Sequence, residues 1–131
     1  MTVVADTRFL LTFKFPPITE TKQKIAFLMD ESLRRGLLIP SIVVTEFIKL
    51  VGKRLGEEVA LIFLKELTTR GAHIVAIDEN IATEAGKLAL RHYDIPIADT
   101  LIAATTTVHR AEHIVSDDKH FKQMKFKTKW L

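Results

Sequence analysis

The alternation of short apolar runs with longer amphipathic segments constrains the fold of this chain more than any other feature. Runs rich in Val, Ile and Leu occupy residues 2–5, 37–39, 73–77 and 113–116, and each is short enough for a strand. Parallel strands that are buried on both faces have this continuous apolar character, and helices connect them. We therefore expect an α/β fold, a three-layer α/β/α sandwich with a central parallel sheet of four to five strands. Residues 126–130 would supply an additional edge strand.

The segments between these runs carry helical signals. Apolar residues at helical spacing, bounded by proline, glycine or capping residues, predict helices at 8–13, 19–35, 41–55, 57–70, 79–92 and 118–124. A further helix contains Asp99 and ends near residue 110. Asp6, Ser41 and Asp78 stand where N-caps belong, because their side-chain oxygens accept hydrogen bonds from the first free N–H groups of a helix.

Four acidic residues recur where strands should end or helices should begin. They are Asp6, Glu46, Asp99 and Asp118. Since α/β proteins build their sites at the carboxyl ends of the strands, we expect these side chains to converge there. Gathered carboxylates repel one another, so a cation must hold them or some must be protonated, and their hard oxygens favour Mg²⁺ or Mn²⁺ over Zn²⁺. The simpler alternative for each aspartate, taken singly, is a helix cap.

Glu46 and Asp99 are notable because their helices are otherwise largely apolar. The neighbours of Glu46 on its helical face include Val43 and Phe47, where a buried carboxylate is costly unless it has a partner. The alternative is a glutamate at the edge of the apolar stripe with its carboxylate in water. Asp99 lies in the first turn of its helix, whose positive dipole end is expected to keep the carboxylate ionised.

Composition limits the class of protein. The chain has 131 residues and no cysteine, which excludes disulfides and thiolate metal sites. No apolar run approaches the ~18 residues of a spanning helix and no signal peptide is evident, so we expect one cytoplasmic domain over residues 1–131, without a membrane partner. The formal net charge of +3 conceals a basic segment, 119–131, with five lysines and no acid. This segment suits a polyanion, although a solvated tail explains it equally well.

The histidines give weaker signals. His109 and His113 have the i, i+4 spacing of a zinc pair, but a helix is expected to end between them and no third nitrogen or sulfur ligand is evident. His120 lies close to Asp118 and is expected at the surface or against a phosphate. No glycine-rich phosphate loop is present, and no serine lies in the context of a nucleophile. The carboxylates therefore remain the principal candidates.

The four acids occur within an ordered set of motifs. Residues 3–7 read Val-Val-Ala-Asp-Thr, residues 44–47 read Val-Thr-Glu-Phe, residues 97–104 read Ile-Ala-Asp-Thr-Leu-Ile-Ala-Ala, and residues 116–121 read Ser-Asp-Asp-Lys-His-Phe. In this order the set resembles the PIN-domain family over nearly the whole chain. The resemblance implies a metal nuclease similar to flap-type nucleases. Many small members of the family are ribonuclease toxins of VapC type that a partner antitoxin holds inactive.

The resemblance also implies residue roles. The residues that would bind one or two Mg²⁺ or Mn²⁺ ions, directly or through water, for phosphodiester hydrolysis are Asp6, Glu46, Asp99 and Asp118. The adjacent Asp117 is an alternative ligand, although the motif favours Asp118. The residues expected to orient ligands or to attract the RNA backbone are Thr7, Ser116, Lys119 and Arg8.

Three functions are compatible with these observations. The first is a Mg²⁺/Mn²⁺-dependent endoribonuclease, either the toxin of a VapBC-type pair or a PIN nuclease of RNA processing outside such a pair. The second is a non-catalytic RNA-binding or scaffold protein, which the intact acids disfavour. The third is a phosphatase or another metal hydrolase of small substrates, which is disfavoured because residues 6–8 lack an Asp-x-Asp pattern. An exposed apolar surface for a homodimer or an antitoxin is expected from Phe9, Phe13, Phe15 and the paired Pro16 and Pro17, with core packing as the alternative.

Overall fold

A parallel sheet of five strands forms the centre of the computed structural model, which describes residues 1–131. The strands are β1 (Val3–Ala5), β2 (Leu37–Pro40), β3 (His73–Val75), β4 (Ile114–Val115) and β5 (Thr128–Lys129). Their order is β3-β2-β1-β4-β5, and every neighbouring pair is parallel. The predicted parallel sheet is therefore confirmed, including its edge strand near the C-terminus.

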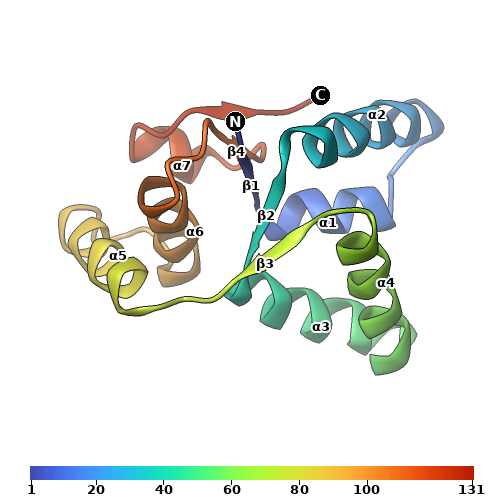
Figure 1. Ribbon diagram of the computed structural model, residues 1–131, viewed down its shortest axis with the longest axis horizontal. Helices are drawn as coiled ribbons and strands as arrows, with labels where there is room; N and C mark the ends of the chain where they lie inside the picture. Colours follow the sequence, from blue (N-terminus) through green and yellow to red (C-terminus); the bar gives the residue numbers. More distant parts are fainter.

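Seven helices cover the two faces of this sheet. One side carries α1 (Thr7–Lys14), α2 (Thr19–Arg35), α3 (Ser41–Leu55) and α4 (Glu57–Thr69). The other side carries α5 (Glu79–Arg91), α6 (Ile97–Val108) and α7 (Lys119–Gln123), as Figure 1 shows. This is the predicted three-layer α/β/α sandwich, because each helix turns its apolar stripe toward the sheet or toward a neighbouring helix.

β1, the middle strand of the sheet, is completely buried. Val3, Val4 and Ala5 are all 0% exposed, since helices cover both faces of their strand. Phe9 of α1 and Phe47 of α3 are equally buried on one side of the sheet. The apolar run that predicted the first strand is therefore among the most deeply buried segments of the chain, and Asp6, which follows it, is also buried.

The junction between β2 and α3 differs from the prediction. Ser41 is not the N-cap, because the chain passes directly from the strand into the helix and Pro40 takes that position. The Ser41 hydroxyl oxygen instead accepts a hydrogen bond from the backbone N–H of Ile77 at 3.1 Å. Ser41 therefore connects the start of α3 to the chain that follows β3.

The expected exposed aromatic surface on α1 is wrong. Phe9 lies in the core, and Phe13 and Phe15 are partly buried against it. Phe13 packs on Phe63 with ring centroids 6.0 Å apart, and the guanidinium of Arg54 lies 4.0 Å from the centroid of the Phe15 ring. These contacts cover part of the aromatic area of Phe13 and Phe15, and core packing accounts for most of the pattern. None of the helices has both the length and the apolar character that crossing a membrane requires.

Candidate metal centre

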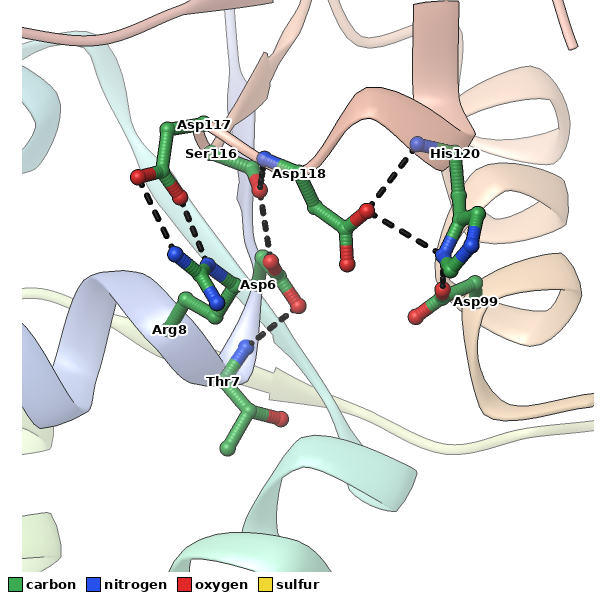
Figure 2. Close-up of polar contacts among 8 residues, drawn as sticks. All are labelled: Asp6, Thr7, Arg8, Asp99, Ser116, Asp117, Asp118 and His120. Atoms are coloured by element: carbon green, nitrogen blue, oxygen red, sulfur yellow. Dashed lines mark hydrogen bonds and ion pairs between the residues drawn. The ribbon is translucent and has the colours of Figure 1, made fainter. Parts of the chain in front are cut away.

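Asp6 follows β1 directly and is the most buried acid of the chain. Its Oδ1 accepts the backbone N–H of Thr7 at 2.7 Å, and its Oδ2 accepts the hydroxyl of Ser116 at 2.6 Å (Figure 2). The residue is 3% exposed. Burial, together with the charges of Asp99 and Asp118, raises its pKa to about 7, although the hydrogen bonds from Ser116 and Thr7 oppose this shift. Asp6 is thus an N-cap of α1 and also a strongly perturbed carboxyl group.

Ser116 connects Asp6 to a second acid, Asp118, across the neighbouring strands β1 and β4. The hydroxyl oxygen of Ser116 accepts the backbone N–H of Asp118 at 2.9 Å while its own proton is donated to Asp6. The carboxylate of Asp118 accepts the backbone N–H of His120 at 2.9 Å and caps the short helix α7. The side chain of Asp118 is 22% exposed, so it remains accessible from solvent.

Asp99 approaches the same edge from α6. It is not a cap, since the N-cap of α6 is Pro96 and makes no side-chain cap bond. Its Oδ2 lies 2.8 Å from Nδ1 of His120, and the same nitrogen lies 3.1 Å from Oδ1 of Asp118. Burial is the largest cause of a raised pKa at Asp99, and the charge of Asp118 adds to it, while the hydrogen bond with His120 opposes it. The positive end of the α6 dipole favours an ionised Asp99, whereas desolvation acts in the opposite direction.

Glu46 completes the group through Thr7. The Thr7 hydroxyl donates a hydrogen bond to Oε1 of Glu46 at 2.6 Å, while the Thr7 backbone N–H binds Asp6. Glu46 is half-buried, and its charge contributes to the raised pKa of Asp99. One residue at the start of α1 therefore orients two acids that are far apart in the sequence.

Asp117 points away from this group, although it adjoins Asp118. Nε and Nη2 of Arg8 donate hydrogen bonds to its two carboxylate oxygens at 2.6 and 3.1 Å, a bidentate pair that Figure 2 shows on the outer side of the site. This pairing lowers the pKa of Asp117 and raises that of Arg8. Of the two adjacent aspartates, only Asp118 lies with the other acids. Lys119 is exposed beside them and forms no ion pair.

This arrangement of acids is accompanied by a family match that decides the classification. The family model of the PIN domain matches residues 3–127. The chain belongs to the PIN-domain family. No curated protein matches it.

Solved structures share the fold of this PIN domain at low sequence identity. VapC20 of Mycobacterium tuberculosis, described as a sarcin–ricin loop cleaving toxin, is 15% identical with a TM-score of 0.79, covering 96% of this chain and 97% of its own. VapBC2 of Rickettsia felis, bound to a DNA fragment from its promoter, is 18% identical with a TM-score of 0.77, covering 99% and 98%. FitAcB of Neisseria gonorrhoeae is 20% identical with a TM-score of 0.75, covering 97% and 96%.

The donor set of this PIN domain fits a hard divalent cation. One carboxylate oxygen each from Asp99 and Asp118 and one ring nitrogen of His120 lie within 4.8 Å of one another. Burial is the largest cause of the raised pKa values of Asp6 and Asp99, and repulsion from the neighbouring carboxylates adds to both shifts. A cation such as Mg²⁺ or Mn²⁺ relieves that repulsion, and oxygen donors are the ligands these ions prefer.

The structure places His120 differently from the sequence-based expectation. The sequence favours a position at the surface or against a phosphate, yet the ring lies between two of the acids. Its position two residues after Asp118, on the first turn of α7, is the only local signal for this contact. His109 and His113 do not form a metal-binding group: His113 is buried and its pKa is lowered by burial, whereas His109 is exposed.

Proposed function

We propose that this PIN-domain protein is a Mg²⁺/Mn²⁺-dependent endoribonuclease and the toxin of a VapBC-type pair. The observation that carries the proposed activity is the convergence of Asp6, Glu46, Asp99 and Asp118 at the carboxyl edge of the sheet. Nuclease chemistry requires positive charge next to a phosphodiester, and an acid cluster that needs a cation supplies the place for it. Membership of the PIN-domain family supports this choice over a phosphatase.

Each part of the site has a task in this proposal. A bound Mg²⁺ or Mn²⁺ supplies stabilisation of the charge that develops on the phosphate oxygens and lowers the pKa of water. The four carboxylates would hold the ion, directly or through water, with Asp6 in its ionised form. Ser116 would connect the Asp6 carboxylate to the backbone at Asp118, and Thr7 would orient the carboxylates of Asp6 and Glu46.

The RNA backbone would approach from the side of α7. Lys119 and Lys122 of this helix and Lys125 beyond it are exposed. Lys129 is less available, because it pairs with Glu31 and belongs to β5. Positive charge that is concentrated next to the acid group brings the polyanion to the cation.

The first experiment is cleavage of folded tRNA and ribosomal RNA in the presence of Mn²⁺. We expect the wild type to cleave and Asp99→Asn to lose cleavage, and EDTA to abolish the activity of the wild type. Asp94→Asn is the matched control, since Asp94 is exposed and makes no side-chain hydrogen bond. Absence of cleavage with RNA binding retained would contradict the proposal and favour a non-catalytic RNA-binding protein.

The toxin assignment has its own test. It draws on the similarity of fold to proteins described as VapBC2, VapC20 and FitAcB. Induced expression of the wild type in bacterial cells should arrest growth, whereas Asp99→Asn expressed at the same level should not. Growth with both proteins, despite cleavage of purified RNA, would instead point to a PIN nuclease of RNA processing.

A homodimer remains part of the proposal, and its surface has to be sought away from α1. Leu90 and Tyr93 at the end of α5 and Ile97 at the start of α6 are 80%, 92% and 63% exposed. These three exposed side chains stand within eight positions of the sequence, where α5 leads into α6, and exposed apolar area is a feature of interfaces. Light scattering should give twice the chain mass for the wild type and the monomer mass for Leu90→Glu. A monomeric wild type would remove the homodimer from the proposal.

A further inference from the structure

One member of the group at the carboxyl edge of the sheet is not an acid. The imidazole of His120 lies between the carboxylates of Asp99 and Asp118, with Nδ1 facing both (Figure 2). We propose that His120 is a nitrogen ligand of the cation, together with Asp99 and Asp118, and that it makes the site prefer Mn²⁺ over Mg²⁺. This inference rests on the proposed metal-dependent function and adds a residue and a metal preference to it.

The distances fit shared ligation. Nδ1 of His120 is 2.8 Å from Oδ2 of Asp99 and 3.1 Å from Oδ1 of Asp118. Neighbouring donors on one six-coordinate ion lie about 3 Å apart, because each metal–ligand bond is only about 2 Å long. The nitrogen that faces both carboxylates carries either a proton or a lone pair, and replacing the proton by a cation turns the same contact into ligation.

The local structure holds the ring in this position. His120 is the second residue of α7, and its backbone N–H is bound by the carboxylate of Asp118. The next residue, Phe121, is 0% exposed and anchors the helix in the core. The His120 side chain is 29% exposed, so the ring is partly covered and still open to an ion from solvent. Pre-positioning of this kind reduces the ordering cost of binding.

The imidazole nitrogen of His120 determines the preference for Mn²⁺ over Mg²⁺. Mg²⁺ is a hard cation that keeps oxygen ligands and gives up its water reluctantly, so an imidazole is a poor ligand for it. Mn²⁺ also accepts carboxylates but tolerates nitrogen better, as a first-row transition ion. Replacing one of three facing oxygens by a nitrogen therefore costs Mg²⁺ more than Mn²⁺.

Pulsed electron paramagnetic resonance of the Mn²⁺-loaded wild-type protein tests the ligand directly. We expect a hyperfine coupling from one histidine nitrogen, which changes to the ¹⁵N pattern when the protein is grown with ¹⁵N-histidine. The coupling should disappear in His120→Gln and persist in His109→Gln, the matched exposed histidine. Mn²⁺ bound to the wild type without nitrogen coupling would overturn the inference while leaving the proposed nuclease intact.

Calorimetric titration with Mn²⁺ and with Mg²⁺ tests the preference. We expect His120→Gln to weaken Mn²⁺ binding about 10-fold or more and Mg²⁺ binding much less, with the melting temperature of the metal-free protein recorded as a check of folding. An equal loss of affinity for both ions would make His120 a positioning residue for Asp99 and would overturn its role as a ligand. A wild type that binds neither ion would overturn the metal centre itself, and with it the proposed function.

Discussion

Ser116 donates its hydroxyl proton to the buried carboxylate of Asp6 across 110 positions of sequence, at 2.6 Å. The same hydroxyl oxygen accepts the backbone N–H of Asp118 at 2.9 Å. One small side chain therefore connects the carboxylate of Asp6 to the backbone at Asp118, and its hydrogen bond also lowers the pKa of Asp6. Ser116 lies where the paired strands β1 and β4 end, so it connects the part of the site that comes first in the sequence to the part that comes last.

Removal of this hydroxyl should weaken metal binding in a pH-dependent way. The hydrogen bond from Ser116 lowers the pKa of Asp6, so Ser116→Ala leaves that pKa still higher. We expect Mn²⁺ affinity at pH 7 to fall about 10-fold and the affinity to recover partly at higher pH. Calorimetric titrations at pH 6, 7 and 8 measure this. Ser116→Thr keeps the hydroxyl and serves as the control, and unchanged binding by Ser116→Ala at every pH would contradict the assigned role.

The buried carboxyl of Asp6 should make the metal-free protein less stable as pH rises. The unfolded chain releases this proton near the ordinary value of 3.8, whereas the folded protein retains it to about pH 7. The folded state binds more protons between these values, so the contribution of Asp6 to the free energy of unfolding decreases across that range. Asp6→Asn should abolish metal binding, yet stabilise the metal-free protein at pH 8 by up to about 4 kcal/mol.

Chemical denaturation of both proteins in EDTA, from pH 4 to pH 8, checks the sign. The two curves should agree near pH 4 and diverge above it, with the variant more stable. His113, whose pKa burial lowers, titrates in both proteins and cancels in the difference. A variant that is less stable than the wild type at pH 8 would show that the carboxylate stabilises the metal-free fold.

The adjacent aspartates should respond oppositely to amide substitution. Asp117 forms an exposed bidentate pair with Arg8, and such surface pairs contribute about 1 kcal/mol or less. Asp117→Asn should therefore leave Mn²⁺ affinity within about 2-fold of the wild type, whereas Asp118→Asn should lower it about 10-fold or more. Titration of the two variants side by side measures this. The reverse result would assign the ligand to Asp117.

Thr7 offers a test of how the carboxylate of Glu46 is held in place. Thr7→Val preserves the shape of the side chain and the backbone bond to Asp6, but removes the hydroxyl that binds Glu46. We expect RNA cleavage and Mn²⁺ affinity to fall about 10-fold, and Thr7→Ser to restore both. If Thr7→Val behaves like the wild type, Glu46 is positioned by its own helix alone.

The exposed lysines of α7 should control RNA affinity without changing the metal site. Lys119→Gln and Lys122→Gln together should reduce binding of a catalytically inactive Asp99→Asn protein to RNA. They should lower the salt slope by about 0.7 for each phosphate that is no longer neutralised, if the RNA there is single-stranded. Filter binding at several salt concentrations measures both. Lys65→Gln on α4, across the sheet from α7 in Figure 1, is the control and should have no effect.

Much of this architecture could be predicted from the sequence because the strands are continuous apolar runs. Val3, Val4 and Ala5 are followed at once by Asp6, and a parallel sheet brings such strand ends to one edge. Asp99 was also predictable as an interruption in the first turn of an apolar helix. For Asp6 and Asp99 the local sequence pattern agrees with the fold, so the positions of these acids in the structure could be inferred from the order of the motifs.

Other features depend on contacts that no local pattern carries. Ser41 satisfies the rule for an N-cap, but only the fold brings the N–H of Ile77 to its hydroxyl. The aromatic residues of α1 read equally well as a surface or as core until α3 and α4 pack against them. His120 belongs to a short polar helix with no periodicity, so its place between two acids follows only from where α6 and α7 meet.

The central position of β1 has a consequence for biosynthesis. β1 is made first, but its neighbour β4 begins only at residue 114, so one side of β1 has no strand partner until most of the chain has been made. Asp6 and Glu46 can meet early through Thr7, whereas Ser116 and Asp118 arrive late. A nascent chain that has not yet reached β4 therefore carries only part of its carboxylate group, and the group is complete only after residues 116–120 have been made.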